Sequence, residues 1–302
     1  GVEGYPVVVS TGAPVDPDLP SLHPFNHMIA AIRPRDEWIW LDLTVPVSPY
    51  GEVYGGLRGR RGVMLRDDGR AEVIEFPRSA ATDNRSSIVV QGTLTAEGHF
   101  EGTYTESVSG AVQYRMRAEF ARPPGERVRR EVARNLAQRV FEDATTDSLE
   151  LFDGKDLEAA PRLWAHVVGD GVMDPLPGGW MLPLRLPSYG SPALIARLEE
   201  DTLRSFPIDA EDAFGLREHY TEFRFELPAG WVADLPESVW AESAFGLYES
   251  TYRQEGRELL VRRVVRGTAG VLPPGRVDEL VAWLRAQRSD DVEYVVLEPP
   301  GG

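Results

Sequence analysis

The chain has 302 residues, of which 32 are basic and 48 acidic, so its formal net charge is −16. Phosphate backbones and anionic membrane surfaces are bound by basic patches, so this charge argues against both as partners. The chain contains no cysteine, which excludes disulfides and thiolate metal sites. No apolar run approaches the roughly 20 residues that span a bilayer.

The first predicted elements are short β-strands. Residues 5–10 form an apolar, valine-rich run, and a proline-rich loop follows from 12 to 24. Two further apolar runs, 28–32 and 38–41, are separated by Arg33-Pro34-Arg35-Asp36, which predicts an antiparallel hairpin. With a turn at Pro34-Arg35, residue 27 faces residue 42 across the hairpin, where opposed Cβ atoms lie about 5 Å apart.

This pairing brings together His27 and Asp42. An imidazole held by a carboxylate is the base half of a nucleophilic-catalysis triad. The expected third member is missing, because there is no cysteine and no serine or threonine stands in a G-x-S-x-G setting. From spacing alone, a strand-edge histidine beside a turn-flanking aspartate explains the pattern equally well.

Two motifs that could hold a metal or a cofactor are incomplete. His23 lies four residues before His27, but two histidines without a third ligand do not make a metal site. The run from Gly55 to Gly62 lacks the ending of a P-loop and the glycine spacing of a dinucleotide fold. The sequence therefore predicts no metal and no cofactor.

The next elements are predicted to form hairpins and one clear helix. Residues 63–65 and 72–76 flank the turn Asp67-Asp68-Gly69, and a polar linker covers about 77–85. Strands at 87–94, 100–105 and 112–120 are predicted to form a meander. Apolar residues at four-residue spacing predict a helix from 126 to 142.

The last part of the chain is predicted to be rich in strands and to contain one more firm helix. That helix begins after Pro274, and residues 193–203 are either a short helix or irregular. The strand candidates are 147–157, 162–168, 172–176, 180–186, 219–227, 245–252, 258–265 and 292–297.

Several motifs resemble the second half of a bacterial transglutaminase-like core. They are Gly1 to Gly12, Pro24-Phe25-Asn26-His27-Met28-Ile29, Trp40-Leu41-Asp42-Leu43-Thr44, Ser48-Pro49-Tyr50-Gly51 and Gly59 to Leu65. In that family a cysteine at the start of a helix is the nucleophile, the histidine of Phe-Asn-His is the base and the aspartate of Leu-Asp-Pro-Thr orients it. The resemblance thus assigns catalytic roles to His27 and Asp42, with Leu43 replacing the usual proline.

The resemblance also implies a domain organisation. Residues 1–78 match the C-terminal part of the core, and the family helix that carries the cysteine would come immediately before Gly1. Residues 84–302 resemble the β-rich domain that follows the core, on the basis of Leu227-Pro228-Ala229-Gly230-Trp231 with Leu235-Pro236. The expected fold class is α+β: antiparallel strands of a partial papain- or transglutaminase-like core, then a sandwich-like β domain with two helices.

Two functions follow as expectations. In the first, the chain is part of a thiol enzyme that acts on protein or peptide amides by acyl transfer or hydrolysis, with the cysteine outside this sequence. In the second, it is a non-catalytic binding or scaffolding protein with a degenerate core, which is what these residues could do alone. The expected partner is a protein or peptide substrate, and the family resemblance implies an extracytoplasmic location.

Overall fold

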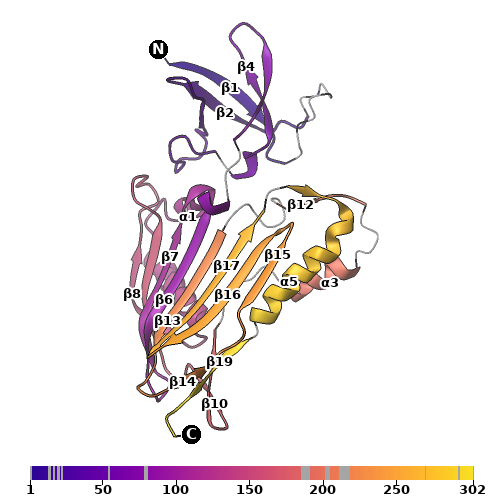
Figure 1. The fold of residues 1–302 in the computed structure, drawn as a ribbon. Coiled ribbons are helices and arrows are strands. Elements are labelled where there is room, and N and C mark those ends of the chain that lie inside the picture. The colour runs from indigo at the N-terminus through magenta and orange to yellow at the C-terminus, as the bar shows by residue number, and fades with distance from the viewer. Residues whose placement is uncertain are drawn as a thin grey trace. The chain divides into compact units, whose positions relative to one another are not determined.

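The structure is a computed structural model in which two compact units are distinguished. Unit 1 comprises Gly1–Asn84, Val108–Pro123 and Asp153–Pro161, and unit 2 comprises the remaining residues, up to Gly302 (Figure 1). Residues 108–123 and 153–161, which were expected in the β-rich domain 84–302, therefore belong to unit 1. The structure describes residues 2–12, 15, 18, 21, 23–53, 55–77, 81–184, 191–200, 205–210, 218–268, 270–291 and 293–301.

Unit 1 is built on a five-stranded antiparallel sheet with the order β3-β2-β1-β4-β5. The expected hairpins are present, so this part of the chain has the predicted antiparallel character. The strands are β1 (Glu3–Val9), β2 (His27–Arg33), β3 (Ile39–Leu41), β4 (Arg61–Leu65) and β5 (Ala71–Glu75).

One face of this sheet carries the core of unit 1. Alternate residues of each strand point to the same face, and Val7, Ile29 and Trp40 are buried there. Phe76 covers this face, and its ring meets that of Trp40 edge to face with centroids 4.9 Å apart. His27 shares this side of β2 with Ile29, so the core fixes the direction in which His27 leaves the strand.

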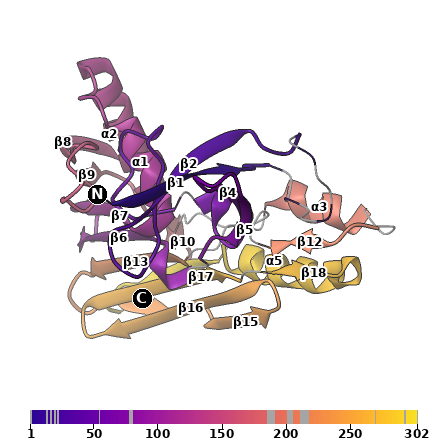
Figure 2. The ribbon, with the colours of Figure 1, turned by 90° about the horizontal axis from the view of Figure 1, so that it is seen from above.

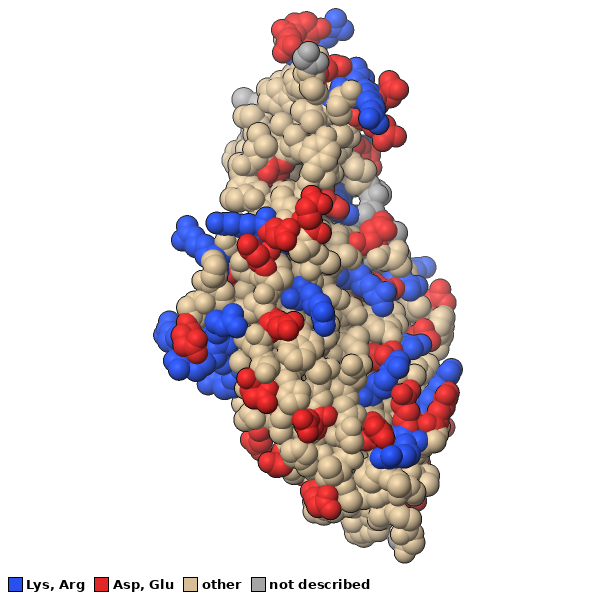
Figure 3. Space-filling view, turned by 90° about the vertical axis from the view of Figure 1, so that its left-hand side faces the viewer, with Lys and Arg blue, Asp and Glu red and all other residues tan. Residues whose placement is uncertain are grey.

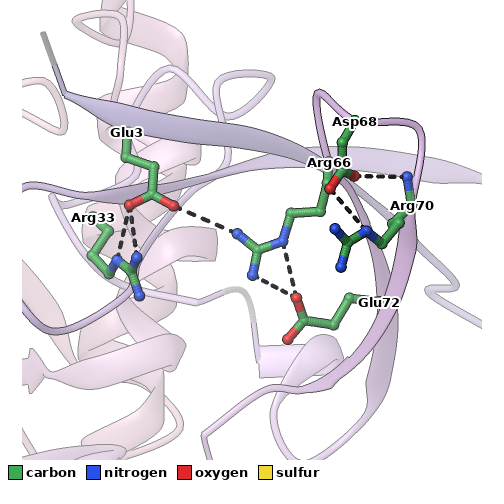
Figure 4. Close-up of polar contacts among 6 residues, drawn as sticks. All are labelled: Glu3, Arg33, Arg66, Asp68, Arg70 and Glu72. Atoms are coloured by element: carbon green, nitrogen blue, oxygen red, sulfur yellow. Dashed lines mark hydrogen bonds and ion pairs between the residues drawn. The ribbon is translucent and has the colours of Figure 1, made fainter.

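The end of the sheet away from His27 carries a network of charged side chains (Figure 4). β1 and β2 pair from Glu3 with Arg33 at this end to Val9 with His27 at the other. The carboxylate of Glu3 accepts hydrogen bonds from Arg33 at 2.7 and 3.1 Å and forms an ion pair with Arg66. Arg33, Arg66 and Arg70 each have an acidic partner, and this network lies at the opposite end of β2 from His27.

The segment 112–120, predicted as the third strand of a meander, is helical instead. A turn of 3-10 helix (Gly110–Val112) leads into α1 (Gln113–Glu119). Apolar residues at every second position suggested a strand, but Tyr114 and Arg117, three residues apart, are the buried pair. The Arg117 guanidinium donates to the carbonyl oxygens of Asp156 and Ala159, both at 2.7 Å. These bonds join two of the three segments of unit 1.

Unit 2 contains an eight-stranded mixed sheet with the order β15-β16-β17-β13-β6-β7-β9-β8. Its centre is the parallel pair β6 and β13, and the pairs flanking it are antiparallel. The strands are β6 (Arg85–Leu94), β7 (Phe100–Val108), β8 (Thr145–Leu151), β9 (Arg162–Gly169), β13 (Glu218–Glu226), β15 (Val239–Ser243), β16 (Gly246–Glu255) and β17 (Glu258–Gly267).

Helices pack on this sheet at both ends. α2 (Glu126–Val140) contacts β8 and β9, and α5 (Val277–Asp291) contacts β15 and β16. α3 (Pro192–Glu200) lies beside α5 (Figures 1 and 2). The chain is therefore α+β as predicted. Four α-helices, α1, α2, α3 and α5, are described within residues 84–302, where two were expected and residues 193–203 were either a third helix or irregular.

Smaller strands complete unit 2. The four-stranded antiparallel sheet has the order β10-β11-β19-β14, and β12 pairs with β18. Their bounds are β10 (Asp174–Leu176), β11 (Gly179–Pro183), β12 (Ile208–Asp209), β14 (Val232–Asp234), β18 (Val271–Leu272) and β19 (Tyr294–Glu298).

A buried polar network ties α5 to the large sheet. Asp290 of α5 is 1% exposed and accepts hydrogen bonds from Tyr248, Ser250 and Tyr252 of β16. Its carboxylate also lies 2.7 Å from Nε of Arg263 on β17. The network satisfies a carboxylate that would otherwise be costly to bury.

On the face seen in Figure 3, basic and acidic side chains are interspersed without a large patch of one sign. None of the described helices is long and apolar enough to cross a membrane.

Candidate active site

β1 and β2 place His27 at a defined position. Beyond the last strand pair, the amide of Asn26 donates to the carbonyl oxygen of Val9 at 3.1 Å. The side-chain oxygen of Asn26 accepts hydrogen bonds from the amide and the hydroxyl of Thr11, at 3.0 and 3.2 Å. Both contacts fix the backbone immediately before His27, so Asn26 helps to position His27 at the start of β2.

His27 and Asp42 are in direct contact. Nε2 of His27 lies 2.9 Å from Oδ2 of Asp42. An ionised carboxylate can only accept a hydrogen bond, so Nε2 carries the proton and donates it. The side chain of Asp42 is 6% exposed and that of His27 is 23% exposed, which leaves the outer part of the imidazole accessible while its carboxylate partner is enclosed.

The register that makes this contact differs from the predicted one. The observed pairs are Ala30 with Leu41, Ala31 with Trp40 and Ile32 with Ile39. The connection contains four bent residues from 34 to 37 in place of a two-residue turn, so the pairing is displaced by two positions. A displacement of two keeps every side chain on its face, and His27 reaches Asp42 diagonally from one strand to the end of the other.

Thr44 holds the other oxygen of the Asp42 carboxylate. Oδ1 of Asp42 accepts a hydrogen bond from the amide of Thr44 at 3.0 Å and from its hydroxyl at 2.7 Å. Burial raises the pKa of Asp42, but the hydrogen bonds from Thr44 and His27 outweigh it, so the pKa lies below its usual value. Asp42 is therefore held as a carboxylate, the form that can stabilise an imidazolium at His27.

A tyrosine from a later part of unit 1 completes the surroundings. The hydroxyl of Tyr114 on α1 lies 3.2 Å from the hydroxyl of Ser48. Burial raises the pKa of Tyr114 to about 12, and the negative charges of Glu52 and Asp42 contribute. This side chain stays a neutral phenol near the Asp42 carboxylate, so it adds no charge to the site.

The other ring nitrogen of His27, Nδ1, makes no hydrogen bond to the described residues. With the proton on Nε2, Nδ1 carries the lone pair and is the atom that can accept a proton. The arrangement can thus act as a general base whose conjugate acid is stabilised by Asp42. The chain has no cysteine that could supply a thiol to this base.

His23 does not join this pair as a metal site. It is exposed, and its amide donates to the hydroxyl of Ser21 at 3.2 Å. Within the part of the chain that the structure describes, no group of three His, Cys, Asp or Glu residues could hold a metal ion.

Two residues of the site were not identified from the sequence. Thr44 carries a recognisable signal, since an aspartate commonly accepts a hydrogen bond from the amide two residues later. Tyr114 carries none, because 66 positions separate it from Ser48 and only the fold brings them together.

Comparisons with known proteins give little further information. No protein-family model matches the chain, and no curated protein matches it. One solved structure, titled a "putative protease" from Parabacteroides distasonis, aligns with 98% of this chain at 11% identity and a TM-score of 0.43. This chain spans 40% of that protein's length. A similarity of this level carries no argument about activity.

Proposed function

We propose that His27 and Asp42 are the base and the orienting carboxylate of a transglutaminase-like thiol site that acts on protein or peptide amides. The observation that carries the proposal is the 2.9 Å contact between Nε2 of His27 and Oδ2 of Asp42, together with the resemblance of the flanking motifs. The 302 residues contain no cysteine, so the thiol would come from a segment or a chain outside them.

The reaction would proceed in two steps that balance. Nδ1 of His27 takes the thiol proton, and the thiolate attacks the amide carbonyl carbon to form a sulfur–carbon bond. The carbon–nitrogen bond breaks, and the leaving amine or ammonia receives the proton from His27. Water or a second amine then attacks the thioester, which releases the acid or the new amide and restores the thiol.

The test uses the protein that contains these residues together with its cysteine-bearing segment. Activity is measured as ammonia release from a glutamine peptide, with and without a primary amine, and as peptide hydrolysis. His27→Ala and Asp42→Asn are each expected to lower the rate by about 10³-fold or more, with unchanged circular dichroism. His23→Ala, which removes an exposed histidine four residues away, is the matched control and is expected to keep the parental rate.

The alternative is a binding or scaffolding protein with a degenerate core, and the absence of cysteine favours it. Under this alternative the His27–Asp42 pair only stabilises the hairpin. Equal rates in the parent and in His27→Ala, or a complete protein with no cysteine near this site, would contradict the enzyme proposal.

A further inference from the structure

The carboxylate of Asp42 has two oxygens, and the structure gives them separate partners. Oδ2 lies 2.9 Å from Nε2 of His27, whereas Oδ1 accepts both hydrogen bonds from Thr44. A carboxylate held by only one oxygen can rotate about its Cβ–Cγ bond, because terminal torsions of this type are broad. Two donors on Oδ1 fix this rotation and leave Oδ2 aimed at the imidazole.

We propose that Thr44 is a positioning residue of this site: it fixes the Asp42 carboxylate so that Oδ2 selects the His27 tautomer with the proton on Nε2. Only the role of Thr44 in catalysis rests on the proposed function. The hydrogen bonds that fix the Asp42 carboxylate are present in this chain, which has no cysteine. A proton on Nδ1 would leave Oδ2 without a donor and would block the atom that has to act as base.

The location of Thr44 supports this role over one in packing. Thr44 is exposed, as is Leu43 before it, whereas Asp42 is enclosed. A change at Thr44 therefore removes no core contact. Among the described residues, the titratable groups that interact with Asp42 are His27 and, from α1, Tyr114.

The test is nuclear magnetic resonance on the 302-residue chain, in which no activity is needed. Ring ¹⁵N shifts of His27 report the tautomer, and ¹³C shifts of labelled aspartate report the ionisation of Asp42, assigned with Asp42→Asn. In the parent we expect one dominant Nε2–H tautomer at neutral pH. Thr44→Val should produce a mixture of tautomers and an upward displacement of the Asp42 titration, and Thr44→Ser should restore the parental behaviour.

The matched control is Thr11→Val, which removes the threonine hydroxyl that contacts Asn26 but leaves Asp42 untouched. Its Asp42 titration is expected to equal that of the parent. Parental tautomer and titration in Thr44→Val, or the same displacement in both valine variants, would overturn the inference. Failure of the thiol reaction alone would leave these spectra unchanged, so the two proposals fail separately.

Discussion

His27 and Asp42 meet diagonally, at the end of a hairpin whose last backbone pair is Ala30 with Leu41. Neither residue lies in a β2–β3 pair, so the contact depends on side-chain reach and on the conformation of the chain after Leu41. Thr44 sets that conformation by donating to Asp42 twice. The geometry of the candidate site therefore depends on the residues at the ends of β2 and β3 more than on the backbone pairing of these strands.

The first prediction concerns stability and pH. Asp42→Ala leaves the donors of His27 and Thr44 without their acceptor and should lower the free energy of unfolding by about 1–3 kcal/mol. The pKa of Asp42 is lowered in the folded chain, so its contribution is present above about pH 4 and declines as pH falls below the ordinary aspartate value of about 3.9.

The measurement for this prediction is urea unfolding of the parent and Asp42→Ala between about pH 2.5 and 6. Asp36→Ala, in the exposed connection of the same hairpin, is the control and should change stability little at any pH. If the difference in unfolding free energy between the parent and Asp42→Ala grew as the pH fell, the predicted direction of the pH dependence would be wrong.

The second prediction tests the register of β2 and β3. Ile32 and Ile39 are directly paired, and opposed Cα atoms lie about 4.5–5.5 Å apart, within the span of a disulfide. Because the chain has no cysteine of its own, the double variant Ile32→Cys/Ile39→Cys should lose both free thiols on mild oxidation, as counted by mass spectrometry after alkylation. The pair Ile32→Cys/Glu37→Cys, which the two-residue turn would oppose, should keep them.

The third prediction concerns the buried Arg117. Its guanidinium donates to the side chain of Gln113 and to two carbonyl oxygens of the segment 153–161. Arg117→Met should lower the free energy of unfolding by about 3 kcal/mol, because the buried guanidinium supplies three charged hydrogen bonds that methionine cannot make. Arg115→Met, exposed on the same helix, should cost less than about 0.5 kcal/mol in the same denaturation experiment.

The fourth prediction concerns the Arg263–Asp290 pair. Asp290→Ala should destabilise the chain by about 3–5 kcal/mol, since it removes the 2.7 Å partner of the buried Arg263, which is left with Asp291 at 3.1 Å, and takes the acceptor from three buried hydroxyl groups. Asp278→Ala, exposed in the first turn of α5, should cost at most about 1 kcal/mol. In a double-mutant cycle with Arg263→Met, the double variant should lose less unfolding free energy than the sum of the two single variants. A loss equal to that sum would exclude a direct interaction.

The sequence predicted the side of the sheet on which a residue lies better than it predicted which residues pair across β2 and β3. The hairpin pattern predicts Ile29, Ala31, Trp38 and Trp40 on the side of His27, and the first two and Trp40 are buried there while Trp38 is half-buried. Its period-two alternation cannot distinguish strand registers that differ by two residues, so the predicted two-residue turn at Pro34-Arg35 was wrong and the connection is longer. It also failed at 112–120, where the apolar spacing fits a strand while contacts to a distant segment favour a helix.

Some features of the site lay outside any local pattern. The bonds of Arg117 end on backbone carbonyls, which every residue type possesses. Tyr114 comes from the second segment of unit 1, which strands β6 and β7 separate in the sequence from the segment that carries His27 and Asp42.

The three-segment composition of unit 1 has a consequence for synthesis. Its last segment ends at Pro161, after strands β6 to β8 of unit 2 have already been translated. At elongation rates of about 5–20 residues per second, residue 161 follows residue 84 by roughly 4–15 s. Early in that interval unit 1 lacks Tyr114 and Arg117, and later it still lacks the carbonyl groups of Asp156 and Ala159 that Arg117 binds. The surroundings of the candidate site would therefore be complete only after strands β6 to β8 of unit 2 have been synthesised.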